Sequence, residues 1–244
     1  MSSGFQKPRG ILFDIGDTLL YQESLDPALG LDRLLQLATN SGVIDAAGFQ
    51  DAGKSLFHDV VSWRIEIREC GLNHIELRFQ SFLRLLLERF GLEMERDHSE
   101  LELEFWKAAC PMLPEPGVHA VLDHLDDCGI PAGVVSNTVF SSRTVEWELA
   151  RHGLTEHLSF VMASSDYGVR KPHADLFLTA VRKLGLSPCE VWYVGNSLEA
   201  DIAGASEAGL VPIWYTRRIR DTSHYEGLLF DHCDAFAGLL QASS

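Results

Sequence analysis

The strongest constraint on the fold is a regular alternation of short apolar runs with helical segments from residue 117 onward. Apolar runs that are typical of buried strands occupy residues 130–135, 160–163, 191–194 and 211–215. Residues with helical spacing fill the intervals, over 117–128, 142–152, 173–184 and 199–208, and a glycine follows each of them. This alternation predicts a parallel sheet with helices on both faces. A similar apolar run at residues 10–15 predicts one more buried strand.

The segment between this first strand and the alternating part has helical periodicity alone. From about residue 24 to residue 109, apolar side chains recur three and four positions apart, and residues 79–90 form a broad apolar face. Asn73 with Glu76 resembles a capping box at the start of a helix, and Asp97 is placed to cap another. We predict a bundle of about four helices, inserted after the first strand.

Three prolines and a glycine at residues 111–117 break the helical pattern and predict a return linker. The predicted fold class is therefore α/β, with a Rossmann-like parallel sheet core and an inserted helical-bundle cap. We assign the core to residues 1–20 and 112–244 and the cap to residues 21–111.

Charge and composition exclude several classes of function. The chain has 35 acidic residues against 20 Lys plus Arg, a formal net charge of −15. It therefore lacks the basic footprint of a nucleic-acid binder and is a poor partner for an anionic membrane. No apolar run approaches the length of a membrane span, and the first ten residues have no signal-peptide core, so we expect a cytoplasmic protein. Five widely spaced cysteines fit reduced thiols.

Polar residues follow the predicted strands and should meet at one edge of the sheet, where ligands of such sheets bind. They are Asp14, Asp17 and Thr18 after the first strand, Ser136 and Asn137 after the second, Arg170 and Lys171 after the third, and Asn196, Ser197 and Asp201 after the fourth. Such a set can hold a small anion beside a carboxylate nucleophile. Its acidic residues can also hold a divalent cation.

Four segments in order resemble the four motifs of the haloacid dehalogenase-like hydrolase superfamily. They are FDIGDTL at residues 13–19, VVSN at 134–137, GVRKP at 168–172 and VGNSLEAD at 194–201. The resemblance covers nearly the whole chain, and the helical insertion is similar to the first type of cap in that superfamily. The implied function is a Mg²⁺-dependent phosphatase that acts on a small phosphorylated metabolite.

Residue by residue, the resemblance implies Asp14 as the nucleophile, Lys171 as the charge-stabilising cation and Ser136 as a ligand of the phosphate oxygens. We also place Asp17 among the catalytic candidates. Further substrate contacts are expected from Asn137, Thr18 and the cap residue Arg64. The implied metal site comprises Asp14, Gly16, Asn196 and Asp201, with Mg²⁺ as the cofactor.

Two positions depart from the phosphatase pattern. Gly16 stands where these phosphatases have a second aspartate that protonates the leaving group, and Asn196 stands where they have an aspartate on the metal. A one-residue shift redirects a side chain on an extended or tightly turning backbone, so we do not expect Asp17 simply to replace the missing acid. Loss of general acid–base help typically costs about 10²–10⁴-fold in rate. The amide of Asn196 offers an oxygen without charge, which predicts weaker metal binding.

These departures leave alternatives open. The 2-haloacid dehalogenases of the superfamily need neither the second acid nor magnesium, and Arg33, Arg64 and Arg68 are available in the cap for a halide. A phosphonoacetaldehyde hydrolase would need a cap lysine such as Lys54. A weakly active or inactive relative that binds a ligand in the cap cleft is the third alternative. Each of these would bind a small anionic substrate or ligand.

Overall fold

A six-stranded sheet, in which all neighbouring strands run parallel, forms the centre of the molecule. The computed structural model describes residues 7–69, 74–219, 221–232, 235–236, 238 and 240, and gives only the backbone of residues 61–69. In the order β5-β4-β1-β6-β7-β8 across the sheet, the strands are β5 (Leu158–Ala163), β4 (Ala132–Ser136), β1 (Gly10–Phe13), β6 (Val191–Gly195), β7 (Val211–Tyr215) and β8 (Leu228–Phe230). The predicted Rossmann-like α/β fold is confirmed.

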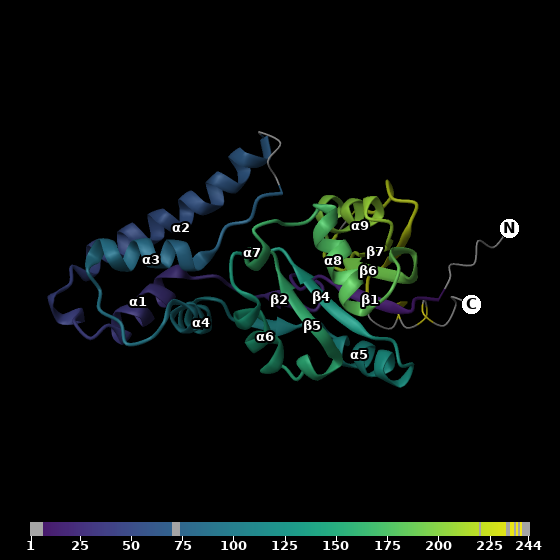
Figure 1. Ribbon diagram of the computed structural model, residues 1–244, viewed down its shortest axis with the longest axis horizontal. Helices are drawn as coiled ribbons and strands as arrows, with labels where there is room; N and C mark the ends of the chain where they lie inside the picture. The colour runs from purple at the N-terminus through teal and green to yellow at the C-terminus, as the bar shows by residue number, and fades with distance from the viewer. Residues whose placement is uncertain are drawn as a thin grey trace.

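Helices cover both faces of the sheet (Figure 1). One face packs against α5 (Val118–Asp127) and α6 (Ser142–Ala150), and the other against α8 (Ala174–Leu184) and α9 (Gly204–Glu207). Along β1, Ile11 and Phe13 join the first of these two cores and Leu12 joins the second, because successive side chains of a strand point to opposite faces. Burial on both faces explains why the strands read as continuous apolar runs.

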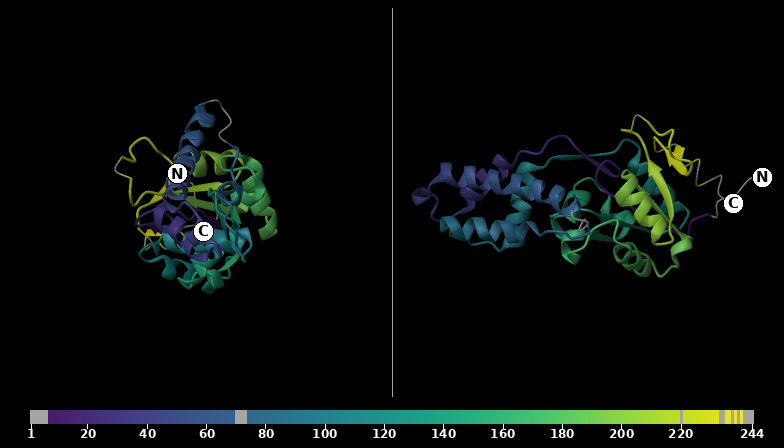
Figure 2. Two further views of the ribbon diagram at one scale, coloured as in Figure 1. Left: turned by 90° about the vertical axis from the view of Figure 1, so that its left-hand side faces the viewer. Right: turned by 90° about the horizontal axis from the view of Figure 1, so that it is seen from above.

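Four helices between β1 and α5 pack against one another at one end of the elongated molecule (Figure 2). They are α1 (Pro27–Leu37), α2 (Ala46–Glu69), α3 (Phe79–Phe90) and α4 (His98–Ala109). The predicted cap at Asp97 is confirmed, since this residue forms a capping box with Glu100 at the start of α4. Within the described residues, none of the helices has both the length and the apolar character that a membrane span requires.

The capping box predicted at Glu76 is wrong, because α3 begins only at Phe79. Glu76 is buried in the preceding loop, where its Oε2 accepts a hydrogen bond of 2.7 Å from the Ser164 hydroxyl. Its predicted partner Asn73 lies outside the described residues. The sequence pattern predicted that the Glu76 carboxylate caps a helix. It binds instead to α7 (Ser164–Tyr167), which is distant in the chain.

The two chain segments that enter and leave the four helices pair with each other. β2 (Leu20–Gln22) and β3 (Met112–Pro114) form an antiparallel ladder, in which Tyr21 lies opposite Leu113. The sequence predicted only a linker around residues 111–117, since a three-residue strand has too little periodicity to detect. Both ends of the helical segment are thus fastened close to the carboxyl end of β1.

Helix α4 is also joined to α6 by buried polar contacts. Glu102 is 1% exposed and accepts hydrogen bonds from the Ser141 backbone N–H (2.9 Å), the Ser141 hydroxyl and the Thr144 hydroxyl (2.8 Å). One turn further along, Trp106 Nε1 donates to Glu148 Oε2 at 2.7 Å. These contacts fix the position of α4 over the sheet edge where the candidate site lies.

The remaining elements are short turns. They are the 3₁₀ turns η1 (Ser41–Val43), η2 (Thr155–His157) and η3 (Pro188–Glu190), and the π-helical turn η4 (Leu198–Ala203). The helix that the sequence predicts over residues 199–208 is therefore split into the π turn η4 and the short helix α9.

Candidate active site

A cavity of about 300 Å³ opens at the carboxyl ends of β1, β4 and β6. The predicted residues that line it are Asp14, Gly16, Ser136, Asn137, Lys171, Asn196 and Asp201. They come together because the strands that precede them, β5, β4, β1 and β6, are neighbours in the sheet and the carboxyl ends of these parallel strands meet at one edge. Arg170 and Ser197 also line the cavity.

Lys171 holds the charged cluster together. Its Nζ donates to Asp14 Oδ1 (2.7 Å), to Asp201 Oδ1 (2.6 Å) and to the hydroxyl of Tyr193 (2.7 Å), which uses all three N–H donors of an ammonium. Burial by itself lowers the pKa of Lys171, but the charges of Asp14 and Asp201 outweigh this effect, so the pKa is raised above its usual value. The side chain is 1% exposed and carries its charge inside the protein.

Asp14 follows β1, and its backbone N–H extends the sheet by donating to Val194 O at 2.9 Å. Burial raises the pKa of its carboxyl group to about 6, with Lys171 acting against this rise and Asp201 adding to it. Asp14 therefore keeps its proton to a higher pH than an ordinary aspartate does and is more basic. A more basic carboxylate is a better nucleophile once it is ionised.

Asp201 is held in place from two sides. Its Oδ1 accepts from Lys171, and its Oδ2 accepts from the Ser197 backbone N–H at 2.9 Å, across the π turn. A Cβ atom on Gly195 would lie 2.5 Å from Asp201 Cγ. The glycine at the end of β6 therefore leaves the space that this carboxylate occupies.

Asn137 fixes the backbone that carries Lys171. Its Nδ2 donates to Lys171 O at 2.9 Å, and its Oδ1 accepts from Lys171 N at 2.8 Å. The amide that we expected to contact substrate is thus engaged at both ends with the protein. Ser136 is buried and lines the cavity.

Asp17 points away from the cavity, as expected from its one-residue displacement. Its backbone has φ = 55°, in the left-handed region, and its Oδ1 accepts from Arg218 Nε at 3.0 Å. Arg218 also lies 2.8 Å from Glu115 Oε1 and stacks on the ring of Tyr21. We therefore remove Asp17 from the catalytic candidates.

Thr18 is not among the residues that line the catalytic cavity, contrary to our expectation of a substrate contact. Its side chain lines a small apolar cavity with Phe13 and Phe236 instead. The chain turns between Gly16 and Leu20, and within this turn Gly16 lines the catalytic cavity whereas Thr18 lines the apolar one.

The cationic cap residues do not form a described anion site. Arg33 donates twice to Glu104 Oε2, at 2.9 and 2.6 Å. It lines neither the catalytic cavity nor a neighbouring apolar cavity that includes Phe79 and Phe105. Arg64 and Arg68 lie on α2, but their side chains are outside the described part of the structure. Lys54 is exposed and lines neither of these two cavities, which gives no support to a phosphonoacetaldehyde hydrolase.

Several side chains of the site were not predicted, among them one tyrosine, one tryptophan and one glutamate. Tyr193 lies in β6 and places its hydroxyl on Lys171, and Trp106 and Glu148 line the cavity from α4 and α6. Tyr193 could have been found from sequence, since a tyrosine within a fully buried strand needs a partner for its hydroxyl. Burial raises the pKa of this hydroxyl well above 10, so it stays protonated.

The described residues of the cavity offer oxygen atoms as donors to a metal ion. Among the described residues, no group of three or more His, Cys, Asp or Glu side chains could hold a metal by itself. The cavity combines two carboxylates, Asp14 and Asp201, with the amide of Asn196 and the backbone of Gly16. Magnesium in proteins is commonly bound through one or two carboxylates and keeps several waters, and this donor set fits such an ion.

Comparison with known proteins identifies the family. The model of the haloacid dehalogenase-like hydrolases matches residues 80–214, which is more than half of the chain. The chain belongs to the haloacid dehalogenase-like hydrolase family. It is 28% identical to a glyceraldehyde 3-phosphate phosphatase from Methanopyrus kandleri over 84% of this chain and 82% of the relative. It is 30% identical to a protein of the same name from Methanocaldococcus jannaschii, over 84% and 83%.

Another similar haloacid dehalogenase-like protein is a pyrimidine 5′-nucleotidase from Streptococcus pneumoniae, which is 27% identical over 84% of this chain and 82% of the relative. Solved structures share the fold. A HAD phosphatase from Thermococcus onnurineus superposes with a TM-score of 0.64 at 20% identity, over 96% of this chain and 98% of that one. A 2-haloacid dehalogenase from Pseudomonas syringae superposes with a TM-score of 0.61 at 21% identity and the same coverage.

Proposed function

We propose that this hydrolase is a phosphatase of small phosphomonoesters and that Asp14 is its phosphoryl acceptor. The observation that carries the proposal is the buried triad in which Lys171 Nζ bridges Asp14 and Asp201. Phosphoryl transfer needs a nucleophile and fixed positive charge beside it, and the triad supplies both in one cavity. The phosphatase and nucleotidase names of the similar proteins support the same reaction class.

In the first step, an oxygen of Asp14 attacks phosphorus. The bond between phosphorus and the leaving oxygen breaks, and the leaving oxygen keeps the electron pair. Lys171 stabilises the negative charge on the transferred oxygens, and the Ser136 hydroxyl donates a hydrogen bond to one of them. In the second step, water attacks phosphorus, which releases inorganic phosphate and regenerates the Asp14 carboxylate.

The other cavity residues position these groups. Asn137 holds the backbone of Lys171, and Tyr193 holds its ammonium. Mg²⁺ is the cofactor we propose, held by Asp14, Asp201, Asn196 and the backbone carbonyl of Gly16. When bound, the ion supplies positive charge that neutralises the phosphoryl oxygens. The uncharged amide of Asn196 should raise the Mg²⁺ concentration that half-saturates the enzyme.

We further propose that the sheet core and the four helices have different roles. Residues 1–20 and 112–244 would carry the chemistry, and residues 21–111 would act as a cap that selects the substrate. Two features support this division: the antiparallel pairing of β2 with β3 at the boundary, and the reach of Trp106 from α4 into the catalytic cavity.

The nucleophile is tested by Asp14→Asn, with Asp17→Asn as the matched variant three residues away. Both are assayed for phosphate release from several phosphomonoesters, with and without Mg²⁺. Loss of the nucleophile should lower kcat by about 10³-fold or more, whereas Asp17→Asn should stay within about tenfold because its carboxylate pairs with Arg218. Activity that survives Asp14→Asn would overturn the proposal.

Dehalogenation without a metal is the second candidate, favoured by the glycine at position 16, since halide leaves without a proton. Halide release from 2-chloropropionate is measured on the same variants. Release that depends on Asp14 and not on Mg²⁺, without any phosphate release from phosphomonoesters, would replace the phosphatase assignment.

A further inference from the structure

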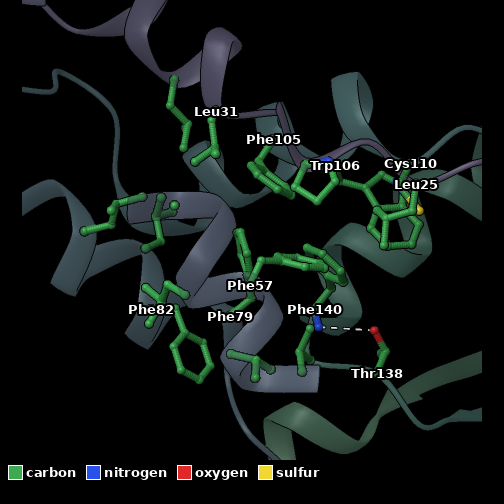
Figure 3. A pocket seen from close by; sticks show the side chains of 18 of the residues that line it. Leu25, Leu31, Phe57, Phe79, Phe82, Phe105, Trp106, Cys110, Thr138 and Phe140 are labelled. Atoms are coloured by element: carbon green, nitrogen blue, oxygen red, sulfur yellow. Dashed lines mark hydrogen bonds between the residues drawn. The ribbon is translucent and has the colours of Figure 1, made fainter. Parts of the chain in front are cut away.

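An apolar cavity of about 230 Å³ lies beneath the cap helices and is walled by aromatic rings (Figure 3). Phe57 from α2, Phe79 from α3 and Phe105 from α4 face it together with Phe140, which follows β4. These rings contact one another, with centroid distances of 4.6 Å for Phe79–Phe105 and 4.8 Å for Phe79–Phe140. Apolar cavities of roughly 150 Å³ are large enough to bind benzene.

None of the described residues that line this cavity carries a charge. Its polar contribution comes from Gln22, Asn137, Thr138 and the thiol of Cys110. The Asn137 amide is already bonded to Lys171 at both ends, and the Thr138 hydroxyl accepts from the Phe140 N–H at 3.2 Å. A polyhydroxylated group would be desolvated here without enough hydrogen-bond partners to replace water, whereas an aromatic group would gain contacts with the rings.

The cap cavity adjoins the catalytic cavity. Four residues line both cavities: Trp106, Met112, Asn137 and Thr138. A molecule whose phosphate lies beside Lys171 can therefore extend its leaving group into the cap cavity. Trp106 is held at this junction by its bond to Glu148 and by an edge-to-face contact with Phe140, with centroids 4.7 Å apart.

None of the described residues in the catalytic cavity is a ready proton donor for a leaving group. Among the described residues that line it, Glu148 accepts hydrogen bonds from Trp106 and Arg151, and Asp201 accepts from Lys171 and Ser197. Lys171 uses all three of its donors within the triad. A leaving group that departs without a proton is therefore favoured, and a phenol, with a pKa of about 10, departs far more readily as the anion than an aliphatic alcohol.

From these two observations we infer that the substrate is an aryl phosphate, whose ring lies in the cap cavity while its phosphate lies beside Asp14 and Lys171. The inference rests on the proposed phosphatase function and names the substrate class for it. It separates this chain from the relatives whose names specify glyceraldehyde 3-phosphate, a polar substrate.

Steady-state kinetics on the wild-type protein compare 1-naphthyl phosphate with glyceraldehyde 3-phosphate in the presence of Mg²⁺. We expect kcat/KM to be higher for the aryl ester by about 100-fold or more, as burial of an aromatic ring implies. Across a series of substituted phenyl phosphates, kcat should fall steeply as the pKa of the leaving phenol rises. Equal or better turnover of the sugar phosphate, or no dependence on the leaving group, would overturn the inference.

A matched pair of variants tests the cavity itself. Leu83 on α3 is buried and lines the cavity, whereas Leu85 on the same helix is 57% exposed. Leu83→Phe should reduce kcat/KM for 1-naphthyl phosphate by about tenfold or more, because the added ring fills space that the substrate needs. Leu85→Phe should change it by less than about twofold. Inhibition by inorganic phosphate should be the same in both variants, since phosphate binds only beside Lys171. If Leu83→Phe unfolds, the wild-type substrate series still decides.

Binding of 1-naphthol, measured by quenching of tryptophan fluorescence, tests the aryl substrate class separately from the phosphatase activity. Turnover of sugar phosphates without naphthol binding would overturn the aryl assignment and leave the phosphatase standing. Lack of turnover of every phosphomonoester would overturn the phosphatase, and the substrate assignment with it. Naphthol binding that Leu83→Phe weakens and Leu85→Phe does not, together with preferred aryl turnover, would support both.

Discussion

Restoring an acid at position 16 should convert the enzyme into a better phosphatase of alkyl esters. Gly16 lines the catalytic cavity, its backbone is outside the left-handed region, and an added Cβ would meet no atom within 4 Å. Gly16→Asp should therefore change the free energy of unfolding by about 1 kcal/mol or less. A carboxyl group there can protonate an alkoxide leaving group, and such help is worth about 10²–10⁴-fold in rate.

The assay is kcat/KM for an alkyl phosphate and an aryl phosphate, measured on the wild type, Gly16→Asp and Gly42→Asp. Gly42 is exposed in the turn η1, an added Cβ meets no atom there either, and the variant controls for the added charge. The alkyl ester should gain by about 10²-fold or more in Gly16→Asp, and the aryl ester by much less, because its leaving group needs no proton. A folded Gly16→Asp protein with no gain on the alkyl ester would refute the reasoning that a missing proton donor limits this site.

Two further predictions concern stability. Tyr193→Phe leaves a buried Lys171 donor without its acceptor and should lower the free energy of unfolding by about 1–3 kcal/mol in urea denaturation, whereas the exposed control Tyr167→Phe should change it by less than about 0.5 kcal/mol. Equal effects of the two variants would contradict the role of the hydroxyl. Burial raises the pKa of Cys110 from 9.0 to about 12, so above pH 9 the unfolded chain loses this proton before the folded chain does. Relative to Cys110→Ala, the free energy of unfolding of the wild type should therefore fall by about 1.4 kcal/mol per pH unit between pH 9 and 12 and should not change below pH 9. A constant difference in the free energy of unfolding between the two proteins over pH 8–11 would contradict this assignment.

The sheet and the convergence of its polar residues could be predicted because both follow from local patterns and from topology. Apolar runs buried on two faces indicate parallel strands, and the carboxyl ends of neighbouring parallel strands share one edge. Asp14, Lys171 and Asp201 lie far apart in the chain, yet each follows a strand of one parallel sheet, and the order of these strands brings them to one edge. The glycines that follow the predicted helices marked their ends for the same local reason.

The rest of the site depends on contacts that no local pattern contains. Asp17 is turned to Arg218, a residue 201 positions away, and Glu76 is captured by Ser164 rather than by a helix start. The aromatic cavity arises where the four helices α1–α4 meet the chain after β4, so its shape depends on packing between elements. Trp106 could not be predicted as a site residue, because helical spacing does not show which face of α4 borders a cavity.

The central claim is that Asp14 forms a covalent phosphoryl intermediate, and the most direct measurement is mass spectrometry after rapid acid quench during turnover of 1-naphthyl phosphate. We expect a phosphorylated peptide in the wild type, with the phosphate on Asp14, and no such peptide in Asp14→Asn. Turnover of the substrate with an unmodified Asp14, or with the phosphate on another residue, would contradict it.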